Sequence, residues 1–547
     1  MNLFSKVADL FKRQASPGSL LAPPGPPLDP AQDTSYITRT ENPTRQQDRL
    51  RLRLPPVNDV PGDVSPLNYA QATKWRAQKV APGLGAPAAD KPPTEPREPS
   101  PAKAYSDAVR AMLRDAEKGD PVIQLKLGTF FENGAGVPQD HAEAVKWYTR
   151  AAERGLAQAQ AKLGFMHEKG LGVSQNVTLA AKWYLQAAEQ DNEAAQCKIG
   201  VFYLEGQGVP LDFDAAVSWL TKSAEKSVAE AQFRLGVCYQ KGVGVGVAYY
   251  ESAKWYRRAA DQDHANAQYN LGMLYRQGVG VPKDAAQSTV WLRKAAGQDF
   301  AEAQYMVAQS YEKGIGVEPD PAQAVEWYRR AAEQGVVKAR HELAVCFQKG
   351  IGVGQDLAAA GHWFKEAAEG GYPAAAYAFA LCLEAGLGMA QDAGESLRWL
   401  RKAADKGHAP AQLKLGLGLL QGGSDGSGEG LKWVRKAADQ GWAEAQFHLG
   451  SLHERGLGVP ANEAEALRLY RRAGDQGYVE AQAVLGTFFE KGRSTSQDFA
   501  EAYKWYNLAA ARGHAGAVAS RDAIARMMNP EQIAEGQKRT AAFAPRK

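Results

Sequence analysis

The stretch KWYTRAAERG, residues Lys146–Gly155, decides how this chain is interpreted, because close copies of it return along the sequence. They read KWYLQAAEQD at 182–191, KWYRRAADQD at 254–263 and EWYRRAAEQG at 326–335. Adjacent aromatic, cationic and acidic side chains in a single copy could belong to an active site. Their recurrence in one register instead indicates a structural unit that is repeated.

The tryptophan of this stretch sets the period. It recurs every 36 residues at Trp147, Trp183, Trp219, Trp255, Trp291, Trp327, Trp363 and Trp399. Trp433 comes two residues early because the ninth unit is short, Leu469 takes the next position, and Trp505 is the last. About eleven units therefore span 120–513.

Each unit divides into two predicted helices. In the unit at 156–191, Ala157, Gln160, Leu163, Gly164 and His167 recur at steps of three and four residues, which indicates a one-faced helix. A Gly-x-Gly-Val segment then ends this helix, since glycine reaches the left-handed conformation without a Cβ clash. The second helix is expected to begin at an Asp N-cap and to carry the tryptophan and an Ala-Ala pair. Glycine inside the first helix costs about 1 kcal/mol, so we expect a neighbouring helix to approach closely there.

The combined pattern, A-x-A-Q-x-x-L-G-x-x-Y-x-x-G-x-G-V followed by D-x-x-x-A-x-x-W-Y-x-x-A-A-x-Q-G, resembles the Sel-one-like repeat, a relative of the tetratricopeptide repeat. The resemblance implies an all-α, right-handed α-solenoid of about eleven 36-residue helix-turn-helix repeats. It also implies that the first helices lie on the concave side and that the protein is an interaction adaptor. A lone helix at 104–119 and a helix and tail at 514–547 are expected to cap the two ends.

Residues 1–103 differ in composition from the array. They hold 18 of the 29 prolines, and their 14 Lys and Arg against 10 Asp and Glu account for the whole net charge of +4. We predict a disordered arm with a short amphipathic helix at 3–13, which would dock on a partner or less readily on a membrane. Its RLRLRLPP segment, 49–56, is a possible occupant of the array. With few cysteines and no signal peptide or membrane span, the expected location is the cytoplasm.

Enzymatic and nucleic-acid functions find little support. Ser223 and Lys226 match the Ser-x-x-Lys of penicillin-recognising enzymes, the alternative function, but Ser223 stands at an Ala-Ala position and the companion motifs are missing. The histidines form no metal motif, so no catalytic residue, metal or cofactor is predicted. Pairs such as Arg257-Arg258 and Arg329-Arg330 form a basic stripe, but the repeats are neutral in sum, and no nucleic-acid partner is expected.

The candidate binding residues occupy first-helix positions outside the Leu-Gly stripe. Two residues before the Leu, six units carry a ring, and we name this row the aromatic ladder: Phe233, Tyr269, Tyr305, His341, Tyr377 and Phe447. These rings are either binding hot spots or seals between adjacent repeats. Acidic residues flank them and predict an acidic groove: Glu230, Glu302, Glu312, Glu384, Glu444 and Glu454. The expected partner is a protein or peptide with basic and apolar side chains.

Overall fold

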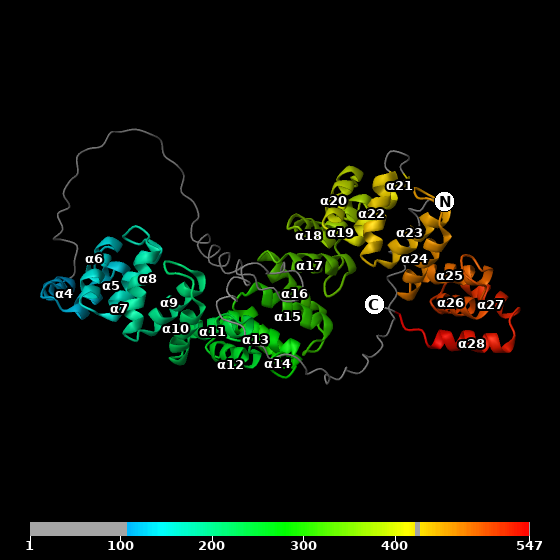
Figure 1. The fold of residues 1–547 in the computed structure, drawn as a ribbon. Coiled ribbons are helices and arrows are strands. Elements are labelled where there is room, and N and C mark those ends of the chain that lie inside the picture. The colour runs from blue at the N-terminus through cyan, green and yellow to red at the C-terminus, as the bar shows by residue number, and fades with distance from the viewer. Residues whose placement is uncertain (1–106, 422–426, 546–547) are drawn as a thin grey trace, which may run out of the picture. The chain divides into compact units, whose positions relative to one another are not determined.

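The computed structural model describes residues 107–421 and 427–545, and each regular element in these ranges is an α-helix. The 25 described helices follow one another as helical hairpins (Figure 1). The helices are α4 (Asp107–Glu117), α5 (Pro121–Asn133), α6 (His141–Glu153), α7 (Ala157–Lys169), α8 (Val177–Glu189), α9 (Glu193–Glu205), α10 (Phe213–Glu225), α11 (Ala229–Lys241), α12 (Tyr249–Ala260), α13 (Ala265–Gln277), α14 (Ala285–Gly297), α15 (Ala301–Lys313), α16 (Pro321–Glu333), α17 (Val337–Lys349), α18 (Leu357–Glu369), α19 (Pro373–Ala385), α20 (Ala393–Asp405), α21 (Ala409–Gln421), α22 (Ser427–Asp439), α23 (Ala443–Arg455), α24 (Glu463–Asp475), α25 (Val479–Lys491), α26 (Phe499–Ala511), α27 (Ala515–Ala525) and α28 (Pro530–Ala541). The predicted α-solenoid of eleven helical hairpins is confirmed.

The odd-numbered helices α5 to α25 are the first helices of the eleven repeats, and the even-numbered helices α6 to α26 are the second helices. Each helix packs against the one before it and the one after it. In the repeat that holds the opening stretch, Trp147, Tyr148, Ala151 and Ala152 are all buried. The predicted disordered arm at 1–103 and the helix at 3–13 lie outside the described residues.

The helix ends follow the predicted chemistry. Asp140 is the N-cap of α6, and its side chain accepts hydrogen bonds from the backbone N–H groups of Ala142 and Glu143. At the other end of a hairpin's first helix, Gly170 caps α7 with a φ of 71°. Two residues on, Gly172 has a φ of 70°, and a Cβ there would lie 2.2 Å from the carbonyl oxygen of His141. This glycine is therefore required both by its conformation and by the close approach of the preceding repeat.

The glycine of the Leu-Gly pair marks the closest contact within a hairpin, as predicted. A Cβ added at Gly128 would lie 2.6 Å from Cε1 of Tyr148, and one at Gly164 would lie 2.9 Å from Cδ1 of Tyr184. A ring of the second helix thus covers each of these glycines. Glycine destabilises the first helix, but a residue with a Cβ would not leave room for that ring.

A column of buried glutamines links successive repeats. Each donates a hydrogen bond from Nε2 to the carbonyl oxygen eight residues earlier, at the end of the preceding second helix; Gln160, for example, donates to Ala152 over 3.2 Å. Its Oε1 in turn accepts from Gln190, 30 residues later, over 2.7 Å. The donors of the first kind are Gln124, Gln160, Gln196, Gln232, Gln268, Gln304, Gln412, Gln446 and Gln482. One side chain therefore joins three consecutive helices.

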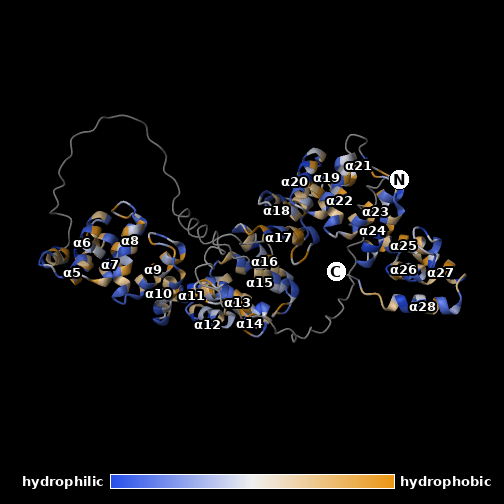
Figure 2. Ribbon diagram, viewed as in Figure 1, coloured by the Kyte–Doolittle hydropathy of each residue, from blue (hydrophilic) through white to orange (hydrophobic). Residues whose placement is uncertain are grey.

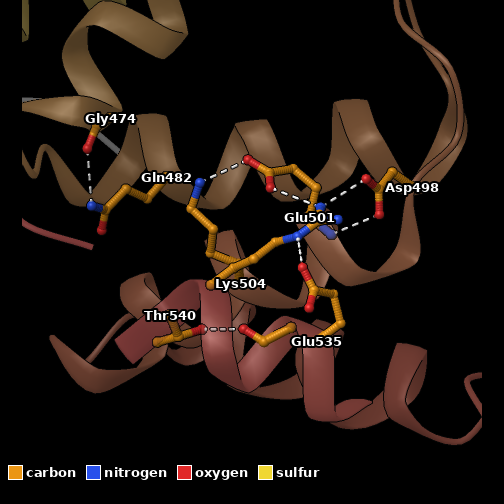
Figure 3. A network of polar contacts seen from close by, with 9 residues as sticks. Gly474, Gln482, Asp498, Glu501, Lys504, Glu535 and Thr540 are labelled. Atoms are coloured by element: carbon orange, nitrogen blue, oxygen red, sulfur yellow. Dashed lines mark hydrogen bonds and ion pairs between the residues drawn. The ribbon is translucent and has the colours of Figure 1, made fainter. Parts of the chain in front are cut away.

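The ends of the array carry helices outside the repeat pattern. At the start, α4 packs on α5. At the other end, both α27 and α28 pack on α26, and α28 shows mostly the hydrophilic colour in Figure 2. Figure 3 shows Asp498, the N-cap of α26, and Glu501 of α26 turned toward Glu535 of α28. Arg539 of α28 joins all three, with its Nη1 2.8 Å from Asp498 and 3.1 Å from Glu501 and its Nε 2.9 Å from Glu535.

Candidate functional site

The aromatic ladder lies between neighbouring repeats. Five of its six rings meet a ring that stands 31 residues later, at the N-cap of the next first helix. The ring centroids are 4.7 Å apart for Phe233 and His264, 5.0 Å for Tyr269 and Phe300, 5.1 Å for His341 and Tyr372, 5.0 Å for Tyr377 and His408, and 5.3 Å for Phe447 and Tyr478. The sixth, Tyr305, meets Tyr328 of its own repeat at 5.9 Å. Such pairs favour contact between neighbouring elements.

The exposure of the ladder rings varies. The prediction that this position points away from the packed surface is wrong for Tyr269, which is only 7% exposed because Phe300 covers it. The other five rings are half-buried. Burial raises the pKa of both Tyr305 and Tyr377 to about 12, so their hydroxyl groups stay protonated at neutral pH. The ring contacts support a sealing role, and the half-exposed surface is what a binding role would use.

The glutamates that follow the ladder are paired with their own array. The hydroxyl group of Tyr328 donates to Glu312 over 2.8 Å, and that of Tyr470 donates to Glu454 over 2.7 Å. Glu384 has no tyrosine in the equivalent position and forms an ion pair of 3.0 Å with Lys414. The same tyrosine contact recurs at Glu132, Glu168 and Glu490. Glu312 and Glu454 are therefore part of the packing between first and second helices, and Glu384 is part of the contact between consecutive first helices.

The glutamates that precede the ladder have different surroundings. Glu230 accepts from Arg234 over 2.6 Å and lies 3.0 Å from a ring nitrogen of His264. Burial alone would raise its pKa, but the His264 hydrogen bond and the Arg234 charge outweigh it and hold the pKa at about 2. Glu302 is half-buried at the equivalent place on α15. Glu444 differs, because burial, with a smaller contribution from the charge of Glu480, raises its pKa.

The basic stripe of the second helices is stacked on tryptophan. In four pairs one cation lies over the tryptophan ring three residues earlier, and this contact holds the cation on its own helix. The distances to the ring centroid are 4.6 Å for Arg258 and Trp255, 4.8 Å for Arg330 and Trp327, 3.8 Å for Lys402 and Trp399, and 4.3 Å for Lys436 and Trp433. These contacts account for the stripe without a nucleic-acid partner.

The Ser-x-x-Lys match has a structural explanation. Ser223 is 0% exposed, and its hydroxyl group donates to the carbonyl oxygen of Glu193 over 2.8 Å. Lys226 donates to the carbonyl oxygen of Asp191 over 2.7 Å. The first contact joins α10 to α9 of the same repeat, and the second joins the C-cap of α10 to the repeat before it. Within 107–421 and 427–545, no group of three His, Cys, Asp or Glu side chains could hold a metal ion.

Two features of the array escaped the sequence reasoning. The glutamine column was recognised only as part of a motif, although each glutamine lies 8 residues after its acceptor and the second partner follows 30 residues later, or 28 in the short ninth repeat. The partners of the ladder rings were also missed. A signal for them existed, because His264, Phe300, Tyr372, His408 and Tyr478 are themselves spaced with the repeat. No helix in the part of the chain that the structure describes is long and apolar enough to cross a membrane.

Comparison with known proteins identifies the repeats. The Sel1 repeat matches residues 123–156, 157–192, 193–228, 229–264, 265–300, 301–336, 337–372, 373–408, 409–442, 443–478 and 479–514. A protective antigen present in uropathogenic Escherichia coli strains, which displays an SLR fold, is 30% identical over 80% of this chain and 94% of its own, with a TM-score of 0.73. A Sel1 repeat protein from Oxalobacter formigenes is 28% identical over 59% of this chain and 95% of its own, with a TM-score of 0.44.

No curated protein sequence matches this chain. Repeats of this fold commonly mediate protein–protein interactions and are generally non-catalytic. Eleven consecutive matches cover the array from α5 to the N-cap of α27. The chain belongs to the Sel1 repeat family.

Proposed function

We propose that this protein is a non-enzymatic scaffold or adaptor that binds a peptide segment of a partner protein along its first helices. The observation that carries the proposal is the half-exposed aromatic ladder, where rings packed against rings of the same or the next repeat stand beside carboxylates. Aromatic side chains fixed by their neighbours lose little entropy on binding, which makes them good anchors.

The chemistry of this surface favours a basic and apolar partner. Tyr305 and Tyr377 offer the edges of half-buried rings for apolar side chains. Exposed Glu312 lies about two helical turns beyond Tyr305 on α15, and Glu384 has the same relation to Tyr377 on α19. Both carboxylates accept from groups of the array, yet their exposed oxygens can still bind a lysine or arginine.

A reducing compartment suits the proposal. Cys197, Cys238, Cys346 and Cys382 are free and buried, so each thiol is used as a small apolar side chain. Burial raises the pKa of Cys238 to about 11, which disfavours the reactive thiolate. We therefore propose a cytoplasmic location.

The proposal is tested by panning a random peptide-display library against the chain and measuring the recovered peptides by fluorescence anisotropy. Recovered peptides should combine Lys or Arg with Leu or aromatic residues. The double variant Tyr305→Ala/Tyr377→Ala should weaken their binding by about tenfold or more, a loss of roughly 1.4 kcal/mol. Arg329→Ala/Arg401→Ala, on the second helices, is the matched control. Equal affinity of both variants, with helicity intact by circular dichroism, would refute the role of the ladder.

The arm at 1–103 is proposed as a regulator. Its RLRLRLPP segment, 49–56, carries the same alternation of cations and apolar side chains that the surface favours. Removing residues 1–103 should then raise the affinity for a recovered peptide. An affinity that stays the same after the deletion would show that the arm does not compete.

A further inference from the structure

The aromatic ladder is interrupted in the last repeat. The position 36 residues after Phe447 is Ala483 on α25, and the ring-bearing position 31 residues beyond it is His514, the N-cap of α27. In α11 and α19 a ladder ring faces a histidine at this spacing, as Phe233 faces His264 and Tyr377 faces His408. In the last repeat His514 is present, but Ala483 provides no ladder ring to face it.

A hollow of about 390 Å³ lies where that ring would stand. Phe447 of α23 and Tyr506 of α26 line it with rings, Val484 of α25 adds an apolar wall, and Ala483 and His514 also line it. These helices are the orange and red ones at the C-terminal end of the array in Figure 1. The volume falls in the range of ligand-binding clefts, and the lining is apolar and aromatic with a few polar groups.

The carboxylate that lines the hollow and its counterpart one repeat earlier have no cation as partner. Glu444 on α23 and Glu480 on α25 occupy the same position in consecutive repeats, and Glu480 lines the hollow. Neither has a lysine or arginine within ion-pair distance among the described residues. Burial, with a smaller contribution from the charge of Glu480, raises the pKa of Glu444. Glu230, at the same position on α11, instead contacts Arg234 at 2.6 Å and His264 at 3.0 Å.

We infer that this hollow is the anchoring subsite for a partner peptide, in which a leucine or aromatic side chain occupies the vacant ladder position at Ala483 and an adjacent arginine or lysine binds between Glu444 and Glu480. The inference rests on the proposed function and names the partner's chemistry at one place on the array. A lysine or arginine there would form an ion pair that neither carboxylate has with the described residues.

The surroundings suit an extended peptide. A second hollow of about 510 Å³ shares Glu480 and His514 with the first and is also lined by Tyr478 and Arg512. A chain that crosses both can place its apolar side chain in the first hollow and its cation beside Glu480. His514 is fixed for contact, because its Nδ1 accepts the backbone N–H of Ala517 over 3.0 Å.

The experiment uses a fluorescein-labelled peptide that copies residues 45–58, RQQDRLRLRLPPVN, as the probe. It is titrated against the full chain and against the chain lacking residues 1–103, whose array has its own core. Ala483→Phe places in the hollow the ring that Phe233 provides opposite His264, so this variant should fold at least as well as the wild type. It should weaken probe binding by about tenfold or more, and Glu444→Gln/Glu480→Gln should weaken it by a similar factor that shrinks at high salt. Ala161→Phe, the same change at the equivalent position of α7, is the matched control and should leave binding unchanged.

The outcomes separate this inference from the proposed function. Loss of binding in the two subsite variants, with Ala161→Phe unaffected and the melting profile of Ala483→Phe undiminished, supports the subsite. Wild-type affinity in both subsite variants, together with weakened binding in Tyr305→Ala/Tyr377→Ala, would overturn the subsite and leave the ladder as the binding surface. If neither form of the chain binds the probe while display peptides still bind, the subsite inference is overturned and the proposed function stands.

Discussion

Tyr184→Phe tests how the hairpins are held together. The Tyr184 ring is 2% exposed and covers Gly164, and its hydroxyl group donates to Glu168 over 2.7 Å. Glu168 also binds Lys169 and Lys198. The variant keeps the ring contact and removes only the hydroxyl group. A hydrogen bond to a charged group contributes roughly 1.5–3 kcal/mol, and since Glu168 keeps its two lysines, we expect a loss of about 2 kcal/mol.

Hydrogen exchange followed by mass spectrometry is the appropriate assay, because a long repeat array need not unfold in one step. A loss of about 2 kcal/mol corresponds to roughly 30-fold faster exchange for the protected amides of α7 and α8. Amides of α25 and α26 serve as an internal control and should not change. An increase below about threefold in α7 and α8, or an equal increase along the whole array, would refute the reasoning.

The reverse change provides a second arm of this test. Phe364 occupies the equivalent position in a repeat that has Gln348 where Glu168 stands, and it is 1% exposed. Tyr256 shows that a tyrosine there can bind a glutamine, since its hydroxyl group donates to Gln240 over 2.7 Å. Phe364→Tyr should therefore slow exchange in α17 and α18 by an amount equivalent to about 0.5–1.5 kcal/mol.

Three further predictions follow from single contacts. The pKa of Glu230 is about 2 in the folded protein and near 4.3 in the unfolded chain, so this carboxylate stabilises the fold above about pH 4.3 and loses that contribution as the pH falls toward 2. Glu230→Gln should therefore flatten the pH dependence of hydrogen exchange in α11 between these two pH values. Arg276 has a buried Nη1 without a hydrogen-bond partner, so Arg276→Met should stabilise its repeat by about 1–3 kcal/mol in urea denaturation, and destabilisation would contradict this account. Gly172→Ala should destabilise more than Gly155→Ala, because both have positive φ but only Gly172 also meets the backbone of the preceding repeat; equal melting temperatures would contradict the steric argument.

The repeated positions were predictable from sequence because they obey one period. Trp147, the Ala151-Ala152 pair and the glycine at 164 each have the role that their recurrence indicated. A helical wheel could not predict how far residues of the next repeat bury a given side chain. Tyr269 has the same angular position as Tyr305, yet Phe300 buries the first, and Val336 stands at the corresponding place beyond the second.

Contacts between distant parts of the sequence were also beyond prediction. Arg539 binds Asp498 and Glu501, about 40 residues earlier, in a segment without the repeat. The C-terminal segment was expected to contain one capping helix, whereas it forms α27 and α28. No periodic signal indicates such a contact, because it depends on how α28 turns back onto α26.

The glutamine column has a consequence for the mechanical unfolding of the array. Arg340 replaces the glutamine in α17 and still donates to the carbonyl oxygen of Ala332 over 3.1 Å, but α19 has Ala376 at this position and no such donor. Nearest-neighbour coupling in a repeat array sets where it separates. Pulled from its ends in a force spectrometer, the array should therefore rupture first between α18 and α19, and extend as two segments rather than eleven.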